Sequence, residues 1–225
     1  HFLMKKHKNS DGWINEGSPH YHYYPLEALL FTANAVKCRG IRLFDRDLHD
    51  MFVEPVKGTY PDLSFPAHSD GWYGANLLSQ SALYEIADAR YNDPLLKRVL
   101  ELTYAQKKRL DPEALLNNQT INASDEKMIQ QSYSFDASGF CLLRSDARTV
   151  VLKFGGEGIG HGHPDKLSIT IHDGKNELVS DFGTSGYGVP DYLKWYKRSL
   201  SHNTVTVDAK DQKRSVGKLL KFTSR

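Results

Sequence analysis

Apolar residues in the first half of the chain recur with a helical period. Spacings of three and four residues between Leu, Ile, Val and Ala positions predict helices over residues 25–37, 76–89 and 94–107. Pro25 and Pro94 open the first and third of these segments, and proline is common in the first turn of a helix. Arg39-Gly40 ends the first segment, and Asn92 and Asp93 follow the second.

In the second half of the chain the apolar residues no longer have a helical spacing. Short β-branched or apolar runs separated by turns predict strands over residues 140–144, 149–154, 167–171, 178–181 and 204–207. Asp173-Gly174, between two of these runs, is typical of a β-hairpin. A polar segment over 111–136 separates the halves, and we place a domain boundary near residue 125. The pattern predicts an α+β chain with a helical domain over 1–125 and an antiparallel β domain over 126–225.

Composition narrows the function without defining it. The 29 basic and 27 acidic residues give a net charge of +2, which argues against a nucleic-acid binder held by bulk electrostatics. No long apolar run predicts membrane insertion, and the N-terminal residues do not have the pattern of a signal peptide. With two cysteines, Cys38 and Cys141, the sequence predicts neither a disulfide framework nor a cysteine metal site.

The glycine-rich segment over 155–165 is the most informative stretch. Its glycines and Pro164 exclude a helix and allow the backbone to approach a ligand closely. His161 and His163 lie two residues apart, which makes them candidates for a metal site, and Asp181 and His202 near strand ends are candidates for further ligands. A structural zinc is one interpretation, and exposed loop histidines are the other.

Tyr21 is a second candidate. It lies between His20 and His22 just before the first predicted helix, where an aromatic cap with a purely structural role is the simpler interpretation.

Four motifs in order along the chain resemble the heparinase II/III-like polysaccharide lyases. They are Glu16-x-Ser18-Pro19-x-Tyr21-His22, the run from Gly160 to Ser168, Asp181-Phe182-Gly183, and the run from Ser201 to Asp208 with Gln212. The run from His161 to Leu167 is most similar to the oligoalginate lyase branch, since the heparin-specific branch tends to have Asn where this chain has Lys166.

The resemblance implies a fold and a set of roles. The fold would be the C-terminal part of an α/α toroid followed by the start of an antiparallel β-sandwich. Tyr21 would be the general acid and His161 the active-site histidine, with a structural zinc bound by His163, Asp181 and His202. The family's Asn-His pair, which neutralises the substrate carboxylate, has no match before Tyr21, so we expect it upstream of His1. We therefore expect a fragment that is inactive alone, from a periplasmic or secreted protein.

β-Elimination removes the C5 proton of a uronic acid and expels the oxygen at C4, so the site must stabilise the charge that develops on the carboxylate. Tyr21 can donate a proton to the leaving oxygen, and His161 can act as base or hold the carboxylate. The residues expected to contact substrate are His22, Trp72, which could stack on a sugar ring, Tyr196 and Arg198. For Trp72, Tyr196 and Arg198 a structural role is an equal alternative.

The first hypothesis is an exo-acting oligoalginate lyase, and a heparin or heparan sulfate lyase is the alternative. The partner would be an anionic uronate oligosaccharide or polysaccharide. A different class is a non-catalytic glycan-binding module that keeps zinc for structure. A third is a metal-dependent hydrolase with a catalytic metal at His161, His163, Asp181 and His202.

Overall fold

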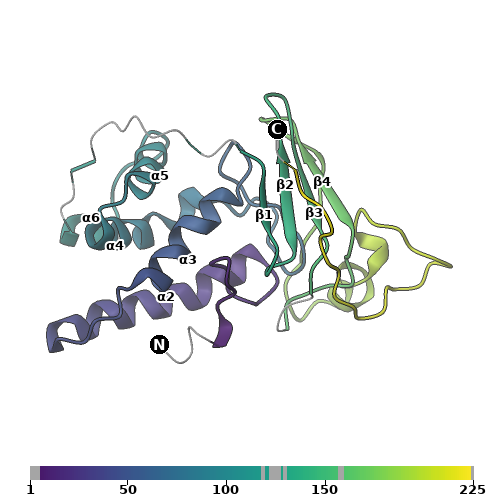
Figure 1. The fold of residues 1–225 in the computed structure, drawn as a ribbon, viewed down its shortest axis with the longest axis horizontal. Coiled ribbons are helices and arrows are strands. Elements are labelled where there is room, and N and C mark those ends of the chain that lie inside the picture. The colour runs from purple at the N-terminus through teal and green to yellow at the C-terminus, as the bar shows by residue number, and fades with distance from the viewer. Residues whose placement is uncertain (1–5, 118–119, 122–127, 129–130, 157–159, 224–225) are drawn as a thin grey trace.

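The computed structural model describes residues 6–117, 120–121, 128, 131–156 and 160–223. Helices come first and strands follow, as predicted for an α+β chain (Figure 1). The helices are α2 (Pro19–Val36), α3 (Arg46–Lys57), α4 (Ser81–Tyr91), α5 (Pro94–Tyr104) and α6 (Pro112–Asn117), with short 3-10 turns η1 (Lys37–Arg39) and η2 (Leu77–Gln80). After the strands come a π-helical turn, η3 (Tyr192–Tyr196), and a 3-10 turn, η4 (Ser199–Ser201).

Helix α2 begins at Pro19, six residues before the predicted start at Pro25. The Ser18 side chain is the N-cap and accepts a hydrogen bond from the Tyr21 amide, and Pro19 occupies the first turn. Pro25 therefore lies inside the helix, where it has no N–H to donate to the Tyr21 carbonyl. The consequence is that Tyr21 sits in the first turn of a helix instead of in the loop before it.

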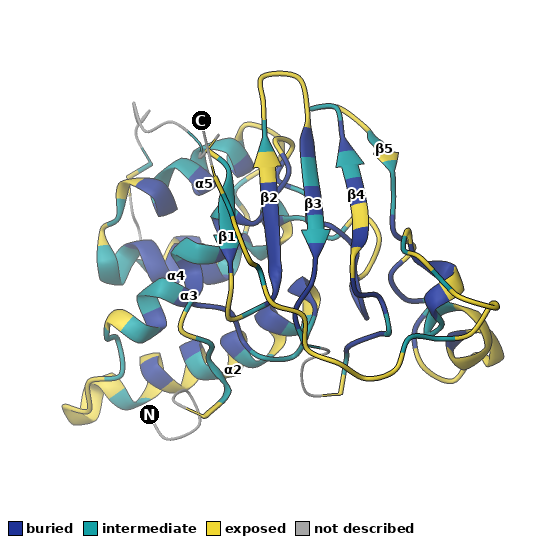
Figure 2. Cartoon of the chain, turned by 45° about the vertical axis from the view of Figure 1, so that its right-hand side comes forward, coloured by how far each residue is buried: buried dark blue, intermediate teal, exposed yellow. Residues whose placement is uncertain are grey.

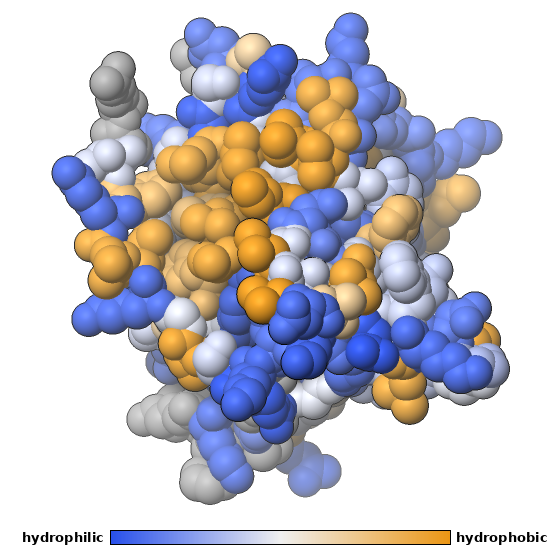
Figure 3. All heavy atoms as spheres, turned by 90° about the vertical axis from the view of Figure 1, so that its right-hand side faces the viewer, coloured by the Kyte–Doolittle hydropathy of each residue, from blue (hydrophilic) through white to orange (hydrophobic). Residues whose placement is uncertain are grey.

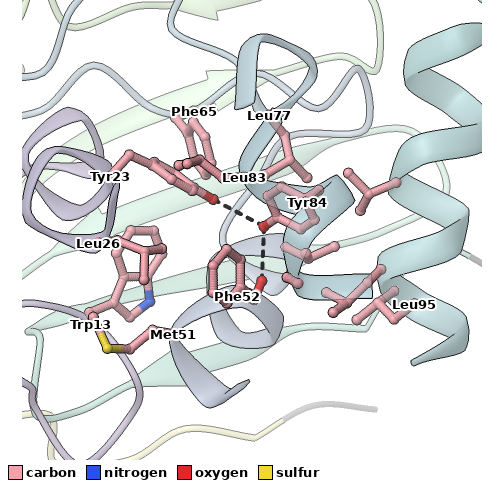
Figure 4. Packing of buried hydrophobic residues seen from close by; sticks show 14 of the residues in the cluster. Trp13, Tyr23, Leu26, Met51, Phe52, Phe65, Leu77, Leu83, Tyr84 and Leu95 are labelled. Atoms are coloured by element: carbon pink, nitrogen blue, oxygen red, sulfur yellow. Dashed lines mark hydrogen bonds between the residues drawn. The ribbon is translucent and has the colours of Figure 1, made fainter. Parts of the chain in front are cut away.

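Helix α3 was not predicted, although its apolar residues have a helical spacing. Leu48, Met51, Phe52 and Val56 are fully or almost fully buried. Asp45 caps the helix by accepting a hydrogen bond from the Leu48 amide. Around α3 the core also contains a buried hydroxyl pair, in which Tyr84 donates to the Phe52 carbonyl at 2.9 Å and lies 3.2 Å from the Tyr23 hydroxyl (Figure 4).

Five strands form one antiparallel sheet in chain order. They are β1 (Tyr133–Phe135), β2 (Phe140–Arg144), β3 (Thr149–Lys153), β4 (Ser168–His172) and β5 (Glu177–Val179), and β4 and β5 form the hairpin predicted at Asp173-Gly174. The strand expected over 204–207 is wrong, since this segment forms no strand and makes only a single bridge from Val207 to Lys210. β-Branched residues are not sufficient for a strand when no neighbouring strand offers a ladder.

The sheet has an unusual distribution of polar and apolar residues. Its inner face, which packs against the first half of the chain, carries buried Thr149, Lys153, Ser168, Thr170 and His172 beside the apolar core residues Phe140, Leu142 and Val151. Its outer face carries partly or largely exposed apolar residues: Leu143, Val150, Leu152, Ile169, Ile171 and Leu178. Figure 2 shows the mixed burial along the strands, and Figure 3 shows hydrophobic side chains gathered on this side of the molecule. The outer face therefore has the composition of a surface that is normally covered.

The two halves share one core. Trp13 makes edge contacts with Phe135 and Phe140 of the sheet, and the Arg144 guanidinium donates to the Lys57 and Thr59 carbonyls at 2.8 and 2.7 Å. The domain boundary predicted near residue 125 lies outside the described residues. None of the helices in the described part of the chain combines the length and the apolar character that crossing a membrane requires.

Candidate active site

Tyr21 and His161 lie together, although 140 positions separate them in the sequence. Tyr21 comes from the first turn of α2, and His161 comes from the glycine-rich loop between β3 and β4. Their rings stack with centroids 3.5 Å apart and an angle of 6° between planes. The His161 side chain keeps 25% of its surface exposed, and Tyr187, whose ring lies near both, is also exposed. A phenol from the helical half and an imidazole from the strand-rich half thus share one solvent-accessible site.

Asp70 organises the residues around this pair. One carboxylate oxygen, Oδ2, lies 3.0 Å from His161 Nδ1 and accepts hydrogen bonds from the Tyr187 and Tyr192 hydroxyls at 2.9 and 3.0 Å. The other oxygen, Oδ1, lies 2.8 Å from His163 Nε2. The Asp70 amide also donates to the His161 carbonyl at 3.0 Å. Asp70 therefore fixes both histidines of the loop.

These contacts set the charge of Asp70. Burial raises its pKa, but hydrogen bonds from His163, His161 and Tyr187 outweigh burial and lower the pKa of Asp70 to about 2. An ionised carboxylate can only accept hydrogen bonds, so His161 Nδ1 carries the proton that it donates to Asp70, and the neutral form of the ring has its lone pair on Nε2. The free Nε2 is the nitrogen that can take a proton from a substrate, and it lies 3.6 Å from Glu16 Oε2.

Tyr187 differs from Tyr21 in its surroundings. Partial burial, followed by hydrogen bonds with Tyr21 and Asp70, raises the pKa of the Tyr187 hydroxyl far above its usual value. The hydroxyl also lies 2.7 Å from His161 Nδ1. Tyr187 thus remains protonated and links Tyr21, His161 and Asp70 through hydrogen bonds.

The structure does not place His22 at this site. Its side chain is fully buried, Nδ1 accepts a hydrogen bond from the Ile14 amide at 3.1 Å, and Nε2 donates to the Met51 carbonyl at 2.8 Å. Successive residues on a helix point about 100° apart, so Tyr21 and His22 cannot face the same way. The expected contact between His22 and substrate is therefore wrong.

The other predicted substrate residues have mixed positions. Trp72 is 42% exposed, its ring centroid lies 6.1 Å from that of His20, and it packs against Gly186, so it borders the site. The Arg198 guanidinium is paired with Asp211 instead of pointing freely to the site. Tyr196 makes no side-chain contact with Tyr21 or His161 that brings it into the cluster.

Lys197, between those two residues, does reach the site. Its ammonium group donates to the Gly160 carbonyl at 3.2 Å and to the Tyr192 hydroxyl at 3.1 Å. A cation beside the His161 loop was not predicted from the sequence.

His163, Asp181 and His202 form a buried hydrogen-bonded row. Asp181 Oδ2 lies 2.8 Å from His202 Nδ1, and His163 Nδ1 lies 3.1 Å from His202 Nε2. Because Asp70 accepts a hydrogen bond from His163 Nε2 and Asp181 accepts one from His202 Nδ1, the two facing nitrogens both carry lone pairs when the rings are neutral. Two such nitrogens need a proton or a metal ion between them, and their separation is close to the roughly 3.3 Å between two ligands of a tetrahedral zinc.

The donor types fit zinc, but Asp181 does not point to the same place as the two imidazoles. Among the described residues, no three His, Cys, Asp or Glu side chains converge on one metal position. Asp181 lies where a carboxylate orients a metal-bound imidazole through its other nitrogen. To act as a ligand it would have to leave His202 Nδ1.

Comparisons with known proteins agree with this architecture. Superposition on the crystal structure of heparan sulfate lyase HepC from Pedobacter heparinus gives a TM-score of 0.73 at 18% identity, covering 96% of this chain and 33% of that one. The chain thus has the fold of a segment of a heparinase-type protein.

Sequence comparison points to the same group of proteins. Residues 129–223 match the family model "Heparinase II/III-like, C-terminal". Similar proteins include an alginate lyase of Stenotrophomonas maltophilia (strain K279a), 29% identical over 88% of this chain, and a heparin-sulfate lyase of Bacteroides stercoris, 26% identical over 93%. The chain therefore resembles the heparinase II/III-like proteins, most directly over residues 129–223. It spans 30% and 31% of the length of these two relatives.

Proposed function

We propose that the full-length protein is a polysaccharide lyase that cleaves uronic-acid-containing glycans by β-elimination. The observation that carries this proposal is the stacking of Tyr21 on His161 at 3.5 Å, which puts a proton donor and a proton acceptor within reach of one sugar ring. The lyase names of the two relatives support the same reaction class.

The roles follow from the hydrogen bonds. The Tyr21 hydroxyl protonates the leaving oxygen at C4. His161 Nε2 takes the C5 proton when the ring is neutral, or donates a hydrogen bond to the carboxylate when the ring is protonated. Asp70 stabilises the protonated imidazole, because its carboxylate already accepts a hydrogen bond from Nδ1. Lys197 and Trp72 border this position, and we propose that they contact the sugar chain.

Alginate oligosaccharides are our first choice of substrate, cleaved from the chain end, and heparin or heparan sulfate is the second. The alginate lyase relative is slightly more similar than the heparin-sulfate lyase, and Lys166 matches the oligoalginate branch. We place the protein in the periplasm or outside the cell. The test is to incubate the full-length protein with each polymer and measure unsaturated products by their ultraviolet absorbance. Product from neither polymer would reject the proposal.

We also propose that a structural zinc binds at His163 and His202, with Asp181 as a third ligand or as the residue that orients His202. The facing lone pairs of the two imidazoles support this proposal. An Asp181→Ala variant separates the two roles of the carboxylate, since loss of a ligand should abolish zinc binding and loss of an orienting group should weaken it by about 10- to 100-fold.

For the architecture, we propose that residues 1–125 contribute to an α/α toroid and residues 126–225 to a β-sandwich. The exposed apolar outer face of the sheet supports the sandwich, since a second sheet packed on it would bury Leu143, Ile169 and Leu178. Limited proteolysis near residue 125 would test the boundary between the two parts.

A further inference from the structure

A buried ion pair lies behind the histidine loop. Lys153 is the last residue of β3, and its side chain is 4% exposed, while the Asp165 side chain is fully buried. The Lys153 ammonium donates to Asp165 Oδ2 at 2.6 Å. Neither residue touches Tyr21 or His161 directly, so the pair is not part of the proposed chemistry.

Ser69 connects this pair to a third segment. Its hydroxyl accepts a hydrogen bond from Lys153 and donates to Asp165 Oδ2 at 3.1 Å. Ser69 is fully buried and has a positive φ of 58°, a conformation that is held only when its surroundings fix it. The next residue is Asp70, which holds His161 and His163.

We infer that Lys153, acting through Asp165 and Ser69, is a positioning residue for His161 in the lyase reaction. Three segments meet at the Lys153 ammonium: strand β3, the loop that ends in Asp165, and the loop that carries Ser69 and Asp70. Among the described residues of the histidine loop, His161 and His163 are both held by Asp70, so their geometry depends on how the Ser69-Asp70 segment is anchored. This inference rests on the proposed function.

An ion pair suits this role better than it suits simple stability. Removing two charges from water is costly, and apolar residues of similar volume often stabilise a protein as well or better. What directional hydrogen bonds add is a fixed relative position of the three segments. A misplacement of about 1 Å at a reacting group can lower the rate about 100-fold.

The test uses the full-length protein and a pair of substitutions that removes both charges of the ion pair, Lys153→Met with Asp165→Asn; Lys166, whose ammonium lies 3.8 Å from Asp165 Oδ1, keeps its charge. We expect kcat on the preferred polymer, alginate or heparan sulfate, to fall by about 10- to 100-fold while KM stays within about threefold. If the pair had a purely structural role, the double variant would have a lower melting temperature, but kcat would not fall selectively while KM stayed constant.

The control is the ion pair between Glu85 and the partly exposed Arg109 in the helical half. Glu85 is fully buried, and Arg109 donates to its two carboxylate oxygens at 2.7 and 2.8 Å. Glu85→Gln with Arg109→Met should lower the melting temperature and leave kcat within about twofold. An equal loss of kcat in both double variants would overturn the inference, as would a folded Lys153/Asp165 variant with wild-type kcat.

A third variant tests the inference even if the Lys153/Asp165 double variant does not fold. Ser69→Ala removes the hydroxyl that joins the loops and leaves no charge unpaired, so kcat should still fall several-fold. If the Lys153/Asp165 variant does not fold and Ser69→Ala has wild-type kcat, the inference is wrong. Wild-type protein that yields no product from either polymer instead rejects the proposed function, and the positioning role with it.

Discussion

His22 should make the stability of the protein sensitive to mild acid. Burial lowers the pKa of His22 to about 4, an effect that its hydrogen bond to the Met51 carbonyl only partly offsets, and an exposed histidine titrates near 6.5. The folded state therefore prefers the neutral ring. The contribution of His22 to the free energy of unfolding is fully present above pH 6.5 and is lost as the pH falls towards 4. Over this range His22 binds a proton in the unfolded chain but stays neutral in the folded chain.

The size of the effect follows from the two pKa values. Each pH unit between them corresponds to about 1.4 kcal/mol, so the full loss is roughly 3 kcal/mol below pH 4. At pH 5.5 the loss is about 1.4 kcal/mol, and at pH 7 it is only about 0.2 kcal/mol. Lowering the pH from 7 to 5.5 should thus cost about 1.2 kcal/mol through His22 alone.

His22→Gln is the informative variant. A glutamine amide can accept from the Ile14 amide and donate to the Met51 carbonyl, as the imidazole does, but it does not titrate. Urea denaturation of both proteins at pH 7 and pH 5.5 gives four free energies of unfolding. We expect the wild type to lose about 1.2 kcal/mol more than the variant between these pH values. An equal loss in both proteins would show that His22 is not the buried neutral group described above.

Two further predictions concern a close backbone contact beside the site and the proposed zinc. Gly183→Ala should destabilise the protein by roughly 3 kcal/mol, because φ is +61° and a Cβ atom would lie 1.9 Å from the Gly71 carbonyl oxygen. Gly174→Ala, with a positive φ but open space around it, is the control and should cost about 1 kcal/mol in the same thermal melts. Metal analysis should find about one zinc per chain, and chelation should lower the melting temperature; protein that is metal-free as isolated and unaffected by chelator would contradict the zinc site.

Local signals predicted much of the fold, and the errors have physical causes. Helices α4 and α5 and strands β2 to β5 were found because their apolar periods are clear. The pattern predicts the start of α2 at Pro25, six residues late, because proline is common in a first turn; Ser18-Pro19 carries the stronger capping signal. The 204–207 segment has strand propensity but no partner strand, which propensity cannot reveal.

Fewer residues of the candidate site could be predicted from the sequence. Motif resemblance singled out Tyr21 and His161, whereas Asp70 was missed because its partners lie 91 or more residues away along the chain. Ser69-Asp70-Gly71 has the sequence of an ordinary polar turn, and only the structure shows that this turn is buried. Lys153 was missed because a lysine at the end of an apolar strand is normally exposed.

Tyr21→Phe in the full-length protein tests the central claim most directly. Phenylalanine keeps the ring that stacks on His161 and removes only the hydroxyl, so the melting temperature should stay unchanged. Formation of unsaturated product, measured by ultraviolet absorbance, should fall by about 100-fold or more, as expected for loss of a general acid. A folded Tyr21→Phe protein that forms product at the wild-type rate would contradict the proposed site.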